Sequence, residues 1–521
     1  MRAFIDTNPS PISLMRPAIV VLPFLVLAAC SSKVSTVPVP ARVDSAAHPA
    51  APPAGDDRAM LRASIDSAVN APKFENAFWG ILIVDPASGD TLYSRNAGKL
   101  FMPASNMKII TGSAALTQLG PDYRYRTTYA ARGTVRDSTL RGDLLVFGRG
   151  DPTVSDHMRK DAMLPLREIA DSLRAHGITR VAGRIIAAGD AFPGPTLGYG
   201  WDWDDLDYDY GAGVDELMFN EGFATIIARG GRRPGAPVTV ETRPARKSLK
   251  VRVTATTVAA PAPGAPKLKA PVFRWDSISG GALVEGTIAV GDSTSDNVAF
   301  RVPDAAYVAA LGEALGDRGL RVDGRVFRDT AAADTLFATL SPPLREILPA
   351  LEKPSQNQIA EVLFKTLALE QTGVGSADSA RRVIERQLVA WGVKDGGYAI
   401  RDGSGLSRHD YVSPETLVRV LATIQRDSAF HVFYDALPIA GVDGTISNRM
   451  KGTPAEGNVH AKTGFVDKAR SLSGYATTTD GRMVIFSALC NNWTVPTSEV
   501  EAVQNMIAAR LAGMRLSPAV Q

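Results

Sequence analysis

The sequence predicts an α/β (α+β) fold in which a body of helices and strands is divided in two by a large β-rich insertion. Residues 58–121 and 336–521 combine amphipathic helices with apolar strands. Between them, residues 122–335 hold many short strands of alternating apolar and polar residues, separated by turns. We therefore expect a discontinuous body whose sheet takes strands from both ends of the chain.

The first part of the body should contain a helix, a hairpin and a second helix. The first helix is expected near residues 59–71, and two apolar strands joined by a Pro- and Gly-containing turn follow in residues 78–96. Residues 103–121, PASNMKIITGSAALTQLGP, have helical apolar spacing and end at a Gly-Pro stop. Helices near residues 163–176 and 305–318 interrupt the strands of the insertion.

The second part of the body is expected to begin with two helices separated at Pro354, the first ending at Lys353 and the second starting at Gln358. Residues 402–410, DGSGLSRHD, form a loop. The remaining elements are predicted as helices at 380–391, 414–425 and 499–511 and strands at 459–466, 470–479 and 482–490.

The N-terminus has the pattern of a lipoprotein signal peptide. An apolar run at residues 18–29 is too short to span a bilayer comfortably, and it ends in Leu-Ala-Ala-Cys, which resembles a bacterial lipobox. We expect residues 1–29 to be the signal peptide, with Met15 as the true start, and Cys30 to be lipidated. The Pro-, Ala- and Ser-rich residues 30–57 then form a tether that leaves the folded part facing the periplasm. An ordinary secretory signal is the alternative.

Composition excludes some other functions. Lysine and arginine exceed aspartate and glutamate by only three charges and form no basic run, so no nucleic-acid partner is expected. The six histidines lie outside any HExxH pattern, and we expect neither a metal nor a cofactor. If Cys30 is acylated, Cys490 has no cysteine partner and is expected in the core.

Ser105 and Lys108 are a candidate nucleophile and base. A serine hydroxyl needs a neighbouring base, and the chain has no GxSxG elbow that would go with a histidine. Ser105 and Lys108 form its one SxxK pattern, and residues three apart lie on the same helix face within reach of each other. The competing interpretation is a capped helix followed by a solvated lysine.

Two further segments could complete such a site. Lys462, Thr463 and Gly464 lie on a predicted strand, where the first two could bind a carboxylate while glycine leaves the backbone clear for a substrate strand. A serine followed two residues later by asparagine occurs at 94–96, 295–297 and 355–357. We choose Ser355 and Asn357, because they lie at a break between two helices of the body, and treat 295–297 as a decoy in a turn of the insertion.

In this order, SNMK, SQN and KTG resemble the three motifs of penicillin-binding proteins and serine β-lactamases. The segments PASNMKIITGSAAL, KPSQNQIAEVL, DGSGLSR, LPIAGVDGTI and HAKTGFVDKARSLSGY are more specifically similar to the low-molecular-mass class C penicillin-binding proteins, the D-alanyl-D-alanine carboxypeptidase and endopeptidase family. This resemblance runs from about residue 59 to the C-terminus. It implies a transpeptidase-like fold with two nested domains in the insertion.

The resemblance also implies a serine acyl-transfer mechanism on peptidoglycan stem peptides. Ser105 would attack the bond between two D-alanines, Lys108 would take its proton, and the N–H groups of Ser105 and Phe465 would bind the oxyanion. Ser355 would relay a proton to the leaving amine, and Asn357 would position Lys108. Penicillins and other β-lactams would acylate the same serine.

The resemblance further implies that Lys462 and Thr463 bind the terminal carboxylate, next to Gly464. Phe465 departs from the family pattern, which has a polar residue there, so a side-chain contact to that carboxylate is lost. Arg408 could contact an acidic group of the stem peptide, or be an ordinary surface arginine. The acidic, aromatic residues 201–210 could line a subsite for a diamino acid, although we favour a solvated loop.

Two alternatives remain at this level. A β-lactamase or esterase of the same superfamily would use the same motifs, although a compact hydrolase does not need such an insertion. A catalytically inactive cell-wall-binding lipoprotein would keep the fold, although its motifs would not need to be complete. The residues after Cys30 are Ser31 and Ser32, and neither is the aspartate of a retention signal. By analogy, this favours an outer-membrane over an inner-membrane location.

Overall fold

The computed structural model describes residues 54–277, 279–329 and 333–516. The predicted signal peptide, the lipidated Cys30 and most of the tether lie outside these ranges. Within them, none of the helices combines the length and the apolar character needed to cross a membrane. The first helix begins at Ala54, which is earlier than the end of the predicted tether at residue 57.

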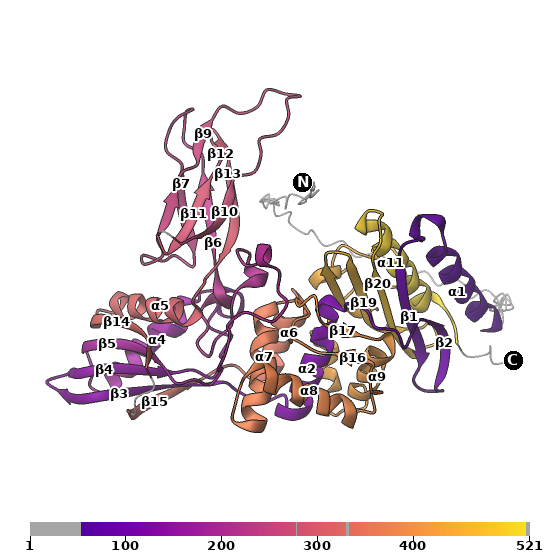
Figure 1. The fold of residues 1–521 in the computed structure, drawn as a ribbon, viewed down its shortest axis with the longest axis horizontal. Helices are drawn as coiled ribbons and strands as arrows, with labels where there is room; N and C mark the ends of the chain where they lie inside the picture. Colours follow the sequence, from indigo (N-terminus) through magenta and orange to yellow (C-terminus); the bar gives the residue numbers. More distant parts are fainter. Residues whose placement is uncertain (1–53, 278, 330–332, 517–521) are drawn as a thin grey trace, which may run out of the picture. The chain divides into compact units, whose positions relative to one another are not determined.

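The body is built on a five-stranded antiparallel sheet whose strands come from both ends of the chain, as predicted. Their order is β18-β19-β20-β1-β2, and Figure 1 draws β1 beside β20. These two strands pair from Phe78 opposite Asn491 to Val84 opposite Ile485. The bounds are β1 Phe78–Asp85, β2 Asp90–Arg95, β18 His460–Val466, β19 Ala469–Thr477 and β20 Met483–Asn491.

Helices cover both faces of this sheet. Successive side chains along a strand point to opposite faces, so apolar neighbours in one strand enter two different cores. Ile81 packs in one core with α1 (Ala54–Val69) and α11 (Thr497–Gly513), and its neighbour Leu82 packs in another core with the remaining helices of the body. Cys490 is fully buried in the first core, as predicted. The remaining helices are α2 Met107–Leu119, α6 Leu344–Glu352, α7 Asn357–Thr372, α8 Ala377–Ala390, α9 Pro414–Ile424 and α10 Phe430–Ala436. Short elements of the body are η1 Pro72–Phe74, η2 Ala104–Asn106, η6 Gly444–Ile446, β16 Tyr398–Ala399 and β17 Tyr411–Val412.

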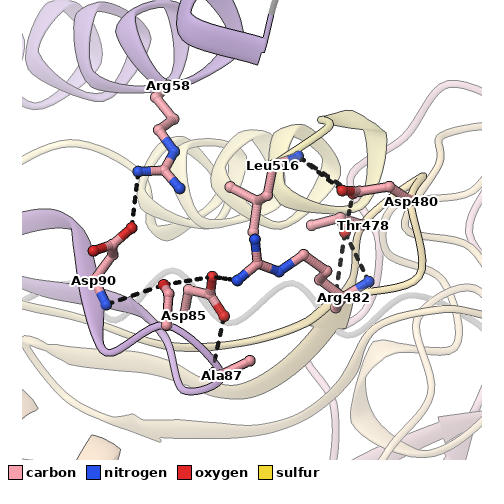
Figure 2. A network of polar contacts seen from close by, with 9 residues as sticks. Arg58, Asp85, Ala87, Asp90, Thr478, Asp480, Arg482 and Leu516 are labelled. Atoms are coloured by element: carbon pink, nitrogen blue, oxygen red, sulfur yellow. Dashed lines mark hydrogen bonds and ion pairs between the residues drawn. The ribbon is translucent and has the colours of Figure 1, made fainter. Parts of the chain in front are cut away.

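A polar network fixes the turns at one end of the sheet (Figure 2). Arg482, in the turn before β20, forms an ion pair with Asp85, the fully buried last residue of β1. In the same turn Asp480 accepts a hydrogen bond from the backbone N–H of Leu516 at 3.2 Å. These contacts join strands and a terminal segment that lie far apart in the sequence.

Residues 126–340 form the β-rich insertion. A five-stranded sheet of order β14-β5-β4-β3-β15 packs against two helices, and three smaller sheets contain the other strands. Because β15 pairs with β3 and ends at Leu340, the insertion extends past the predicted limit at residue 335. We propose that the five-stranded sheet with its helices is one nested domain and that the three smaller sheets together form the other. The strands are β3 Arg126–Arg136, β4 Thr139–Phe147, β5 Arg180–Ala188, β6 Phe223–Arg229, β7 Thr239–Arg243, β8 Val251–Val253, β9 Thr256–Val258, β10 Val272–Asp276, β11 Gly281–Glu285, β12 Thr287–Ala289, β13 Ser293–Ala299, β14 Arg321–Asp329 and β15 Asp334–Leu340. The helices and 3₁₀ turns are α3 Asp156–Arg159, α4 Met163–Ala175, α5 Pro303–Asp317, η3 Trp203–Asp205, η4 Asp209–Gly211 and η5 Asn220–Gly222.

Candidate active site

Ser105 lies in the 3₁₀ turn η2, immediately before α2, rather than in the first turn of the α-helix itself. Ala104 before it has a positive φ of 46°, a sparsely populated conformation that directs the chain sharply into the turn. Lys108 lies in the first turn of α2, three residues after Ser105. Because residues three apart in successive helical turns are neighbours, the two side chains meet.

The amino group of Lys108 has three polar neighbours. Its Nζ lies 2.8 Å from Ser105 Oγ, 2.6 Å from Asn357 Oδ1 and 2.9 Å from the carbonyl oxygen of Ser404. Asn357 Nδ2 donates to the carbonyl of Tyr210 at 2.9 Å, which fixes the amide so that its oxygen faces the lysine. Asn357 Oδ1 and the Ser404 carbonyl oxygen can therefore only accept hydrogen bonds, and they bind the two hydrogens of a neutral lysine amine. Its lone pair then faces the Ser105 hydroxyl.

Burial favours this neutral form. Lys108 is fully buried, and desolvation together with the nearby positive charge of Lys462 lowers the pKa of Lys108 to about 7, whereas Glu352, Asp402 and Glu361 act in the opposite direction. An amine with a pKa near neutrality is a suitable general base at physiological pH.

The loop at residues 402–410 is held rigidly, and it supplies the Ser404 carbonyl. Glu361 on α7 accepts hydrogen bonds from the backbone N–H groups of Gly403 at 3.0 Å and Ser404 at 2.8 Å. Asp402 accepts from the indole of Trp201 at 2.9 Å. The carbonyl that fixes one hydrogen of Lys108 is thus anchored from the body and from the insertion.

Strand β18 carries Lys462, Thr463 and Gly464, as predicted. Lys462 is fully buried, and its backbone carbonyl accepts from Asn106 Nδ2 at 2.8 Å, which ties the strand to the turn that contains Ser105. Desolvation lowers the pKa of Lys462 below its ordinary value, with Glu352 opposing the shift. The Thr463 hydroxyl shares a 2.7 Å hydrogen bond with that of Thr445.

Gly464 lies against the Ser105 turn. A Cβ on Gly464 would lie 2.2 Å from Ser471 Oγ, 2.6 Å from the Pro103 carbonyl oxygen and 2.9 Å from the Ser105 nitrogen. Glycine is therefore required here by close packing inside the protein. The sequence alone predicts instead that glycine leaves the backbone clear for a substrate strand. Pairing with an extended peptide depends on β18 as a whole, because β18 is the edge strand of the sheet.

We expect Gly464→Ala to move β18 away from Ser105, since two of the three clashing groups belong to the backbone. Acylation by a β-lactam should slow by about 100-fold, the usual effect of a small misplacement of reacting groups. Gly316→Ala is the matched control, because an added Cβ there meets nothing within 4 Å. Equal acylation rates for both variants would show that the contact with Ser105 is unimportant.

Phe465 belongs to β18, and Arg408 reaches the end of that strand from the loop at residues 402–410. The Phe465 side chain is 54% exposed, and the guanidinium of Arg470 lies 5.3 Å from the centre of its ring. Arg408 donates to the carbonyl of Asp467, just beyond β18, at 2.9 Å. These two interactions involve neither Ser105 nor Lys108, and the roles of both side chains toward substrate stay proposals.

Ser355 lies between α6 and α7, at the predicted break, with a positive φ of 67°. Its hydroxyl is partly exposed and has no hydrogen-bond partner among the described residues, so it differs in this respect from Asn357. The backbone nearby is fixed because Thr445 N–H donates to the Lys353 carbonyl at 3.1 Å. Ser295 and Asn297 lie within strand β13, which corrects the expectation of a turn there.

The acidic, aromatic segment 201–210 has both exposed and bound parts. Trp203 is 82% exposed, as in a solvated loop, but Trp201 binds Asp402 and the Tyr210 carbonyl binds Asn357. Sequence reasoning missed these contacts, along with the roles of Ser404 and Thr445, although the segments DGSGLSR and LPIAGVDGTI had already been identified. No group of three or more His, Cys, Asp or Glu side chains in the described part of the chain is arranged to hold a metal ion.

Comparison with known proteins identifies the family of this chain. The model of the D-Ala-D-Ala carboxypeptidase 3 (S13) family matches residues 61–514. The chain belongs to this family. It is 33% identical over 468 residues to the D-alanyl-D-alanine carboxypeptidase of Actinomadura sp. (strain R39). The alignment covers 87% of this chain and 84% of the relative.

Two solved structures confirm the fold of this S13 chain. The crystal structure of penicillin binding protein 4 (dacB) from Haemophilus influenzae matches with a TM-score of 0.74 at 24% identity, over 84% of this chain and 97% of that one. The same protein complexed with a novel β-lactam matches with a TM-score of 0.70 at 22% identity, over 88% and 99% of the two chains. These matches confirm the predicted α/β fold with a β-rich region. The family model confirms the predicted family.

Proposed function

We propose that this chain is a serine D-alanyl-D-alanine carboxypeptidase that acts on peptidoglycan stem peptides through an acyl-enzyme on Ser105. The observation that carries the proposal is the buried Lys108 Nζ, 2.8 Å from Ser105 Oγ, with its other two hydrogen-bonding positions occupied by acceptors. A serine so placed beside a neutral amine is an activated nucleophile. Family membership supports the choice of substrate.

In the acylation step Ser105 Oγ attacks the carbonyl carbon of the penultimate D-alanine, and its proton passes to Lys108. The backbone N–H groups of Ser105 and Phe465 stabilise the developing oxyanion. Asn357 keeps the lysine aligned throughout, because its amide is fixed by the Tyr210 carbonyl.

Collapse of the tetrahedral intermediate breaks the bond to the terminal D-alanine. Its nitrogen receives the proton that Lys108 took from Ser105, relayed by the hydroxyl of Ser355, while Lys462 and Thr463 bind its carboxylate. Water then attacks the carbonyl carbon of the acyl-enzyme and gives a proton to Lys108. The ester bond to Ser105 breaks, the shortened peptide is released, and Lys108 returns that proton to Ser105 Oγ. Arg408 contacts an acidic group of the stem peptide, whereas the exposed part of the segment 201–210 remains a solvated loop.

β-Lactams are expected to acylate Ser105 by the same attack, forming an ester that hydrolyses slowly. The enzyme would work in the bacterial cell envelope, held by a lipid on Cys30 at the outer membrane and facing the periplasm. Turnover of β-lactam as the main activity would identify a β-lactamase, and absence of both activities would identify an inactive cell-wall-binding lipoprotein.

The test uses the full chain, incubated with a stem peptide that ends in D-Ala-D-Ala, and measures free D-alanine. We expect stoichiometric release of one D-alanine per peptide and none from the peptide that ends in L-Ala-L-Ala. A cross-linked stem-peptide dimer in a parallel reaction measures endopeptidase activity. No D-alanine release combined with no penicillin labelling would contradict the proposal.

The rate of acylation should depend on pH through Lys108. Because the amine acts as base only when neutral, and its pKa lies at about 7, the rate should rise tenfold per unit below that value and level off above it. At higher pH the rate should fall as Lys462 loses the charge that binds the substrate carboxylate. Stopped-flow acylation by a chromogenic cephalosporin between pH 5 and 10 measures both limbs, and a rate independent of pH near 7 would exclude Lys108 as the base.

A further inference from the structure

Glu352 is a buried acid that the proposed mechanism does not use. It is the last residue of α6, and none of its surface is exposed. Neither carboxyl oxygen has a hydrogen-bond partner among the described residues. Because an isolated buried carboxylate is costly, a group in this state must be either protonated or compensated by nearby positive charge.

The carboxyl group lies against the helix that carries Lys108. Gly112 is one turn further along α2 on the same face, and a Cβ there would lie 2.8 Å from Glu352 Oε1. The other atoms nearest to that position belong to Leu348 and Phe433, so the surroundings are apolar. The glycine leaves the space that the carboxyl group occupies.

The charged groups that act on Glu352 are Lys462 and Lys108, one from β18 and one from α2. Burial raises the pKa of Glu352, and the two lysines lower it. Conversely, the negative charge of Glu352 raises the pKa of both lysines. The positive charge of Lys462 lowers the pKa of Lys108. The protonation of each of these three side chains therefore depends on the charge of the others.

The proposed mechanism requires different charges on the two lysines. Lys108 must be neutral to accept a proton, and Lys462 must be charged to hold a carboxylate. Lys462 is fully buried, and Arg470 opposes its protonation further. If Glu352 is negatively charged while Lys462 is positively charged and Lys108 is neutral, the net charge of the three side chains is zero. This arrangement has the lowest desolvation penalty in an apolar interior.

We propose that Glu352 is a positioning residue of the acyl-transfer site, whose carboxylate keeps Lys462 protonated while the neighbouring Lys108 is neutral. This proposal rests on the proposed function. It predicts that Glu352 affects the pH dependence of the reaction without contacting substrate.

The test compares the pH profiles of acylation for the wild type, Glu352→Gln and the control Glu346→Gln, each as the full chain. Glu346 lies on the same helix but is exposed, so its replacement removes the same charge at the surface. We expect both limbs of the Glu352→Gln profile to move to lower pH by roughly one unit, since each lysine loses a nearby negative charge. On the alkaline side the rate should then fall by about tenfold. The control profile should not move.

Two outcomes would overturn the proposal. An unshifted Glu352→Gln profile would mean that Glu352 is already neutral, because glutamine mimics the protonated acid. A uniform loss of rate at every pH would indicate a packing role alone. Glu352→Asp, which keeps the charge, should restore the profile toward that of the wild type.

If Glu352→Gln does not fold, the wild-type protein with ¹³C-labelled glutamate carboxyl groups provides the measurement. The Glu352 resonance, assigned from the Asp variant, should be that of a carboxylate at the pH of maximal rate, and a carboxylic acid there would contradict the proposal. A wild-type chain with no acylation at any pH would refute the proposed function itself.

Discussion

Ser105→Ala should abolish D-alanine release, lowering the rate by at least about 10⁴-fold, because removing an acyl-transfer nucleophile removes the covalent pathway altogether. Penicillin should form no covalent adduct. Ser105 is half-buried in a short turn, and its loss leaves Lys108 two of its three polar neighbours. The thermal midpoint should therefore change by only a few degrees.

The matched control is Ser88→Ala, which removes another partly buried hydroxyl hydrogen bond, to Asp85, on a turn of the same body. It should release D-alanine at the wild-type rate. Covalent labelling of Ser105→Ala, with its fold retained, would assign the nucleophile to another residue.

Lys108→Met should reduce the rate of acylation by about 10²- to 10⁴-fold, the range expected when a general base is removed. The remaining rate should no longer rise through pH 7, since no group with the pKa of Lys108 then controls Ser105. Methionine fills similar space but leaves Asn357 Oδ1 and the Ser404 carbonyl without their donor. Stability should fall by about 1–3 kcal/mol, which denaturant unfolding measures.

Lys99→Met is the control, because Lys99 is exposed and lies close to the motif in sequence. It should leave both the rate and its pH dependence unchanged. If Lys108→Met kept the rise through pH 7, another side chain would have to be the base.

Much of the site could be predicted because its groups are side chains at fixed spacings. The distance between Ser105 and Lys108 follows from residues i and i+3 on a helical turn, and the motif of Lys462 requires only a strand. The choice of Asn357 over Asn297 depended on position in the chain. The structure supports the choice, since Asn357 binds Lys108 and Asn297 binds Thr225 and Asp209 in the insertion.

The contacts that were missed involve backbone groups or residues with no characteristic spacing. The carbonyls of Ser404 and Tyr210 orient Lys108 and Asn357, and a carbonyl has no sequence signature. Glu352 precedes the SQN motif, separated from Ser355 by Lys353 and Pro354, but appears in the sequence as one more charged residue of an amphipathic helix. Its burial depends on α2, more than two hundred positions away, where Gly112 leaves room for it.

The measurement that tests the account most directly is the site of covalent attachment of penicillin. The wild-type chain is labelled, denatured and digested with trypsin, which cleaves after Lys99 and Lys108, and the peptides are sequenced by mass spectrometry. We predict one adduct, on the serine of the peptide Leu100–Lys108, LFMPASNMK. An adduct on Ser355 or any other residue, or no adduct in a chain that releases D-alanine, would contradict the assignment of Ser105 as the nucleophile.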